Sequence, residues 1–141
     1  MRIVLCPGCF DMFHDGHARL LSAAKRSGDR SGDSWLIVAV NTDESVKALK
    51  GPERPVQSLR VRMAAVARHH DVDAVIPFNG AQYELIDAIR PDIVVKGSDY
   101  TEDRVVGHHL IRAYGGTIRI IERIKGISTS ESLQKQPACG K

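Results

Sequence analysis

Five short runs of apolar residues, rich in valine and isoleucine, recur along the chain, and segments with helical spacing of apolar positions separate most of them. In residues 58–69, Leu59, Met63 and Val66 fall on one face of a helix. Strands that alternate with amphipathic helices are typical of a parallel sheet covered by helices on both sides. The sequence therefore predicts an α/β fold, a Rossmann-like open parallel sheet with helices on both faces. The predicted strands are residues 3–5, 36–40, 74–76, 93–95 and 118–121.

Two further helices follow from the same spacing. Residues 82–90 form one of them, and Pro91 ends it. The other contains Leu110 and Ile111 and ends before Gly115.

Polar clusters follow four of the five predicted strands, at residues 14–17, 41–44, 96–100 and 123–130. Open α/β sheets bind ligands at the carboxyl ends of their strands. We therefore expect these four loops to build a single site at one edge of the sheet.

The first cluster, His14-Asp15-Gly16-His17, stands where a helix begins. His17 shares a helical register with Leu20, which predicts that its ring points inward over the first turn. A helix N-terminus binds anions, and phosphate is the usual one, while Gly16 allows a ligand close to the backbone. The pattern predicts a phosphate site at which His14 and His17 converge. The alternative is that the two histidines only cap the helix and satisfy each other.

A second helix N-terminus is predicted at Ser128, where Ser128-Thr129-Ser130-Glu131 has the capping-box pattern. Its hydroxyl and N–H groups would suit the outer phosphates of a nucleotide, and Arg123 would add a bidentate contact. Many helices are capped in this way for stability alone, which is the alternative here.

Basic residues flank the connection at residues 51–55. They are Lys47, Lys50, Arg54 and Arg62. Charges in such a loop are often a solvated surface, but loops beside phosphate sites also supply cations that close over the ligand. We expect Lys50 and Arg62 to have that function.

The pair Cys6 and Cys9 has the C-x-x-C spacing of a redox pair or half a zinc site. The third cysteine, Cys139, stands alone in a polar tail, and the helix begins several residues after Cys9, so we expect neither function. The pairs His69-His70 and His108-His109 lack a spacing that puts both members on one helical face, and we expect them at the surface.

Length and composition fit one folded domain. The chain has 141 residues, of which 43% are hydrophobic, and its net charge is +3. We expect a single domain over residues 1–136 with a polar tail at 137–141. The basic residues are spread out, so neither nucleic acid nor a membrane is an expected partner. No apolar stretch is long enough to span a membrane and no signal peptide precedes the first strand, which predicts a cytoplasmic protein.

With these motifs in hand, the chain resembles the cytidylyltransferase-like nucleotidyltransferases, which are marked by an HxGH loop and a C-terminal I-S-T-S/T motif. It is most similar to the adenylyltransferase domains that make ADP-heptose from ATP and D-glycero-β-D-manno-heptose 1-phosphate. The resemblance covers nearly the whole chain. It is carried by residues 8–17, 37–43, 46–51, 54–56, 91–97, 99–100 and 128–129.

The resemblance implies that a phosphate oxygen of the substrate attacks the α-phosphorus of a nucleoside triphosphate, and that pyrophosphate leaves with Mg²⁺ sharing its charge. It implies catalytic roles for His14 and His17, no metal held by the protein itself, and a homodimer that binds only small molecules. The nucleotide-binding residues it implies are Cys9, Phe10, Gly16, Lys50, Gly97, Asp99, Arg123, Gly126, Ser128, Thr129 and Ser130. The substrate-binding residues it implies are Asp11, Lys47, Arg62 and Tyr100.

Three departures leave the substrate open. Ser98 replaces a second glycine, and the Ser-Gly-Asp loop at residues 27–33 is extended. Arg123 with residues 126–130 is similar to glycerol-3-phosphate cytidylyltransferase. We expect ATP and a sugar phosphate, with CTP and glycerol 3-phosphate or another polyol phosphate as the alternative. A nucleotide-binding module without catalysis is a third reading, which the two intact histidines disfavour.

Overall fold

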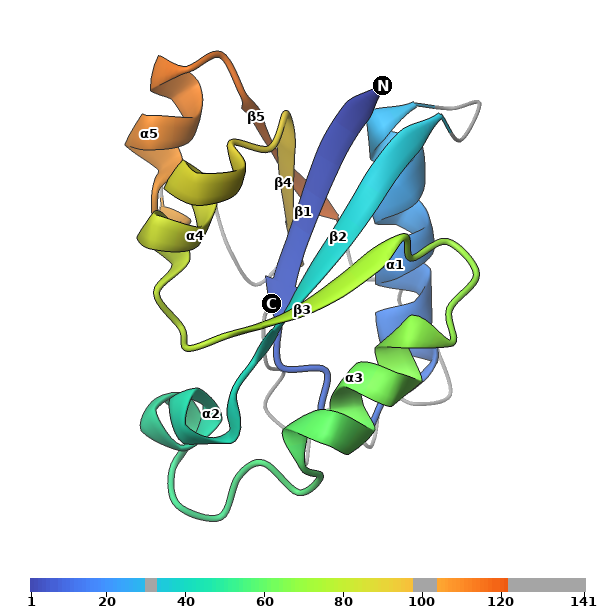
Figure 1. The fold of residues 1–141 in the computed structure, drawn as a ribbon, viewed down its shortest axis with the longest axis vertical. Helices are drawn as coiled ribbons and strands as arrows, with labels where there is room; N and C mark the ends of the chain where they lie inside the picture. Colours follow the sequence, from blue (N-terminus) through green and yellow to red (C-terminus); the bar gives the residue numbers. More distant parts are fainter. Residues whose placement is uncertain (30–32, 98–103, 122–141) are drawn as a thin grey trace.

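The computed structural model describes residues 1–29, 33–97 and 104–121 (Figure 1). Strands and helices alternate along most of this length, as the apolar pattern predicts. The strands are β1 (Arg2–Gly8), β2 (Ser34–Asn41), β3 (Ala74–Phe78), β4 (Ile93–Gly97) and β5 (Thr117–Ile121). The helices are α1 (Asp15–Gly28), α2 (Asp43–Lys50), α3 (Leu59–Ala67), α4 (Gln82–Ile89) and α5 (His108–Ala113).

The five strands form one parallel sheet in the order β3-β2-β1-β4-β5. Helices α1 and α3 cover one face and α4 and α5 the other, as Figure 1 shows. Each face has its own apolar core, the first around Leu21 and Val66 and the second around Ile86 and Ile111. The predicted Rossmann-like α/β fold is confirmed.

The strand order reverses between β1 and β4, which makes their carboxyl ends the point where such sheets bind ligands. The segment after β1 contains the two histidines of the predicted site. For the loops that the structure describes, the topology agrees with the prediction that polar residues gather at this edge of the sheet.

Strand β1 continues through Pro7, beyond the predicted residues 3–5, although proline cannot donate to a ladder. The backbone oxygen of Ile3 accepts from the N–H of Asp92 beside β4, and the N–H of Ile3 donates to the Asp92 carboxylate. Alternate residues of a strand face the same neighbour, so the nitrogen of Pro7 also faces β4. The β1–β4 pairing ends at Leu5 with Val94, so at Pro7 no ladder bond is lost.

Helix α2 was not predicted, because its eight residues bury only Ser45 and Val46 and show no long apolar stripe. Its ends are nevertheless marked in the sequence. The side chain of Thr42 accepts from the backbone N–H of Ser45 at the start, and Gly51 caps the end with φ of 104°. None of the described helices is long and apolar enough to cross a bilayer.

Candidate active site

The histidine loop, residues 9–14, carries the chain from the end of β1 to the start of α1. It contains two non-glycine residues in the left-handed region, Phe10 with φ of 54° and Met12 with φ of 52°. The ring of Phe10 folds back over Gly8, where an added Cβ would stand 2.7 Å from the ring atom Cε2. The loop is therefore tightly wound, and it places His14 directly before the helix.

His14 and His17 cap helix α1 reciprocally. Nδ1 of His14 accepts a hydrogen bond from the backbone N–H of Gly16 at 2.9 Å, and Nδ1 of His17 accepts one from the backbone N–H of His14 at 3.2 Å. The two rings stack with their centroids 4.0 Å apart. Gly16 leaves room for the His14 ring in this position, because an added Cβ would stand 2.7 Å from Cε1 of His14.

This capping defines what the imidazoles can offer a ligand. A nitrogen that accepts an N–H must carry a lone pair, so in each neutral ring the proton resides on Nε2. Both rings thereby present an Nε2–H donor at the positive end of a helix. The two histidines do cap the helix, as the alternative reading expected. The cap uses only their Nδ1 atoms and leaves the proton on Nε2, so capping does not exclude a role as hydrogen-bond donors.

His17 is 5% exposed and contacts two phenylalanine rings. Its ring centroid is 5.4 Å from that of Phe10 and 5.4 Å from that of Phe13. The predicted inward orientation of His17 is confirmed, and the aromatic contacts restrict the rotation of its ring.

The segment at residues 54–57 braces the histidine loop from outside. Both carboxylate oxygens of Asp11 accept backbone N–H groups, from Val56 at 2.7 Å and from Gln57 at 3.0 Å. The backbone N–H of Met12 donates to Oε1 of Gln57 at 3.1 Å. Asp11 thus lies in the histidine loop with its oxygens directed to the protein backbone, and its substrate-binding role stays a prediction.

Arg62 was expected to close over a ligand, but its side chain is fully buried, at 0% exposure, so that expectation is wrong. Its guanidinium donates to the backbone oxygens of Cys9 and Gln57 and to the Asp43 carboxylate. The sequence places Arg62 on a helix beside a loop, where charges are often exposed. Its burial was not predictable because its partners Cys9 and Asp43 lie in distant parts of the chain.

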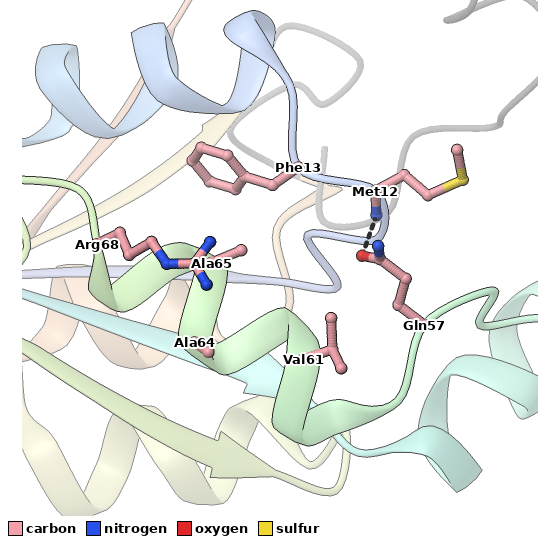
Figure 2. A pocket seen from close by; sticks show the side chains of 7 residues that line it. All are labelled: Met12, Phe13, Gln57, Val61, Ala64, Ala65 and Arg68. Atoms are coloured by element: carbon pink, nitrogen blue, oxygen red, sulfur yellow. Dashed lines mark hydrogen bonds between the residues drawn. The ribbon is translucent and has the colours of Figure 1, made fainter.

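Figure 2 shows a pocket of about 530 Å³ between the histidine loop and α3. The hydrogen bond from Met12 to Gln57 crosses one end of it, and Arg68 lies toward the other. No sequence motif pointed to this pocket. Its lining residues are Met12, Phe13, Gln57, Val61, Ala64, Ala65 and Arg68.

Lys96, near the end of β4, is a buried cation that belongs to the predicted polar cluster at residues 96–100 but was given no binding role of its own. Burial lowers its pKa to about 8, while the nearby thiols of Cys6 and Cys9 act in the opposite direction. Its signal in the sequence is a single charge that ends the apolar run of β4. Gly97 follows it and is buried at the end of β4, and its nucleotide-binding role stays a prediction.

Cys6 and Cys9 are free thiols that pack in different apolar clusters, Cys6 in the core under α1 and Cys9 against Val46 of α2. Burial raises the pKa of Cys6 to about 12, with Lys96 acting to lower it, so the reactive thiolate is suppressed. The thiol of Cys9 donates to Oδ1 of Asn41 at 3.6 Å. These contacts give the C-x-x-C spacing a packing role.

The remaining predicted residues divide into two groups. Lys47 and Lys50 lie in the last turn of α2, the first exposed and the second half-buried. The others lie outside the described residues, so their placement stays a prediction. They are Asp99, Tyr100, Arg123, Gly126, Ser128, Thr129 and Ser130, together with the tail at 137–141.

The expectation that both histidine pairs lie at the surface is wrong for His69. Its Nε2 bonds the backbone oxygen of Ala18, at 3.0 Å, and its Nδ1 accepts from the N–H of Asp71. His69 therefore ties the end of α3 to α1. Although His69, His70 and Asp71 have the spacing of a metal site, both ring nitrogens of His69 are engaged.

Residues 5–135 match a family model described as cytidylyltransferase-like. Curated relatives include proteins called bifunctional protein HldE. The chain is 44% identical over 135 residues to the one from Alcanivorax borkumensis and 47% identical over 135 residues to the one from Methylobacillus flagellatus. The match covers 95% of this chain and 27% of each relative, so the chain spans about a quarter of their length.

Among solved structures, the fold is similar to a lipopolysaccharide core biosynthesis protein from Thermoplasma volcanium. The TM-score is 0.68 at 27% sequence identity, over 90% of this chain and 99% of that one.

Proposed function

The chain belongs to the cytidylyltransferase-like family, and from that membership we propose that it transfers AMP from ATP to a sugar phosphate of the heptose 1-phosphate type, with release of pyrophosphate. A nucleotidyltransferase is the reaction class that the family supports. The finer choice of ATP and a sugar phosphate is supported by the resemblance to ADP-heptose-forming domains. It also agrees with the solved relative, a protein of lipopolysaccharide core biosynthesis.

The observation that carries the proposal is the pair of imidazoles at the start of α1. Their Nδ1 atoms accept from backbone N–H groups, so their Nε2–H donors are set at a helix N-terminus beside the β1–β4 switch point. Donors fixed in advance stabilise developing charge without reorganising during the reaction.

In the proposed reaction, an oxygen of the acceptor phosphate attacks the α-phosphorus in line. The bond from the α-phosphorus to the bridging oxygen breaks, and pyrophosphate leaves with that electron pair. His14 and His17 would donate from Nε2 to phosphate oxygens as their charge builds. Lys50 and Arg123 would hold the triphosphate, and Lys47, Asp11 and residues 99–100 would border the acceptor.

Magnesium is expected with the triphosphate and would share the charge of the leaving pyrophosphate. The imidazoles and backbone N–H groups of the loop suit phosphate oxygens. Both oxygens of Asp11 already accept backbone N–H groups, which does not suit a metal ligand. The proposal therefore includes no metal cage built by the protein.

The test is a matrix of nucleotides against acceptors, with pyrophosphate release as the rate and mass spectrometry of the product. ATP with D-glycero-β-D-manno-heptose 1-phosphate is expected to give the fastest release and a product of the mass of ADP-heptose. Faster release from CTP with glycerol 3-phosphate would make the chain a cytidylyltransferase. Nucleotide binding without release from any pair would leave a binding module.

A further inference from the structure

Arg62 joins three segments that the chain keeps apart. Nη1 donates to the backbone oxygen of Cys9 at 2.8 Å, Nη2 to Oδ1 of Asp43 at 2.7 Å, and Nε to the backbone oxygen of Gln57 at 3.0 Å. These acceptors belong to the histidine loop, the first residue of α2 and the segment before α3. One buried side chain therefore fixes the three against each other.

We propose that Arg62 is a positioning residue, which couples the histidine loop to helix α2 and does not contact the substrate. This inference rests on the proposed function, because the groups it positions are the expected catalytic histidines and the expected phosphate-binding lysines. It differs from the expectation that Arg62 itself binds substrate.

The histidine loop needs such support because Phe10 and Met12 hold left-handed backbone conformations. Residues of this kind persist where surrounding contacts determine them. Arg62 donates to the carbonyl oxygen of the residue directly before Phe10. Asp11, which lies between the two left-handed residues, accepts two backbone N–H groups of the segment before α3. The N–H of Met12 itself is held by Gln57, the bond drawn in Figure 2. Contacts from Arg62 and from residues 56–57 thus fix the turn that positions His14.

The second end of the coupling is Asp43, whose carboxylate lies at the start of α2 and is 44% exposed. The same helix packs Val46 against Cys9 and carries Lys47 and Lys50 in its last turn. Loss of Arg62 would release both the loop and the helix. Loss of the Asp43 charge would weaken only the helix end.

The identity of the side chain separates positioning from substrate contact. A guanidinium offers five N–H donors in a planar fork and serves three acceptors in different directions, whereas an ammonium is a compact charge that cannot reproduce this geometry. If Arg62 only supplied charge to a phosphate, lysine would replace it. If it positions the two segments, lysine will fail almost as badly as an uncharged residue.

The experiment compares Arg62→Lys, Arg62→Met and Asp43→Asn with Arg60→Met, a control at an exposed position of the same helix. Pyrophosphate release gives kcat and KM, and ¹⁵N NMR gives the tautomers of the histidine rings. Both Arg62 variants are expected to lose kcat by on the order of a hundredfold, because small misplacements of reacting groups cost that much. Asp43→Asn is expected to raise the KM for nucleotide with kcat within about threefold of wild type. Arg60→Met should match wild type.

The NMR spectra provide a readout that does not depend on turnover. Wild type and Arg60→Met should show His14 and His17 with the proton on Nε2, and the Arg62 variants should lose this pattern while circular dichroism shows a folded protein. If Arg62→Met does not fold, Arg62→Lys and Asp43→Asn decide. Wild-type kcat and wild-type ring signals in Arg62→Lys would overturn the proposal. If wild type itself releases no pyrophosphate, the proposed function fails, and the ring signals still test the positioning.

Discussion

Replacing Gly16 with alanine should separate activity from stability. The new Cβ would stand 2.7 Å from Cε1 and 3.0 Å from Nδ1 of His14, so the ring must leave its cap. A lost N-cap costs about 1 kcal/mol, and alanine in place of glycine inside a helix returns about 1 kcal/mol. The free energy of unfolding should therefore change by less than about 1 kcal/mol, which corresponds to a melting temperature within about 4 °C of that of wild type. Turnover should fall by on the order of a hundredfold, as when one donor to the transition state is removed.

Pyrophosphate release and thermal melts of four proteins test this reasoning: wild type, Gly16→Ala, His14→Ala and the double variant. Because the added methyl group has no ring to displace once His14 is gone, Gly16→Ala should not reduce turnover further in the His14→Ala background. Asp15→Ala, an exposed neighbour in the first turn, serves as the control and should keep wild-type turnover. Wild-type turnover in Gly16→Ala, or losses that multiply in the double variant, would refute the account.

Three other predictions concern groups outside the histidine pair. Cys6→Ser should lower the free energy of unfolding by about 1 to 3 kcal/mol, because a hydroxyl enters an apolar core. Cys9→Ser should keep a donor to Asn41. Both variants should retain turnover, and loss of turnover in a folded variant would revive a redox role. Burial lowers the pKa of Lys96 from 10.5 to about 8, so the cost of burying its charge is complete below pH 8 and vanishes as the pH passes 10.5. The gain in urea midpoint from Lys96→Met should therefore shrink between pH 7 and pH 10, and a constant gain would contradict this. His69→Ala should cost about 1 to 2 kcal/mol through its lost bonds to α1 and leave kcat unchanged, which denaturation and steady-state rates would check.

The sheet was predictable because its central strands β1, β2 and β4 are largely buried and read as continuous apolar runs. The site was predictable where local pattern defines it. His14 and His17 follow a strand and open a helix, and their spacing alone predicts the inward ring of His17. Gly16 was singled out for close approach of a ligand, which stays a prediction, and the structure adds another reason for a glycine there, the room that the His14 ring needs.

What failed depends on contacts between distant segments. Arg62 has the sequence environment of a surface charge, and only the Cys9 carbonyl and the Asp43 carboxylate explain its burial. His69 was considered only as half of a pair, whereas its bond reaches Ala18 on another helix. The first strand was predicted to end at residue 5, short of Pro7, because the neighbour that the Pro7 nitrogen faces is not visible in the sequence.

The turnover of His17→Ala and His14→Ala at saturating nucleotide tests the central claim most directly. If their Nε2–H groups stabilise the charge that develops on the transferring phosphate, kcat should fall by on the order of a hundredfold or more while nucleotide affinity falls much less. Pyrophosphate release at several ATP concentrations separates the two effects. Near-normal kcat in both folded variants would contradict the claim and leave the pair as a helix cap.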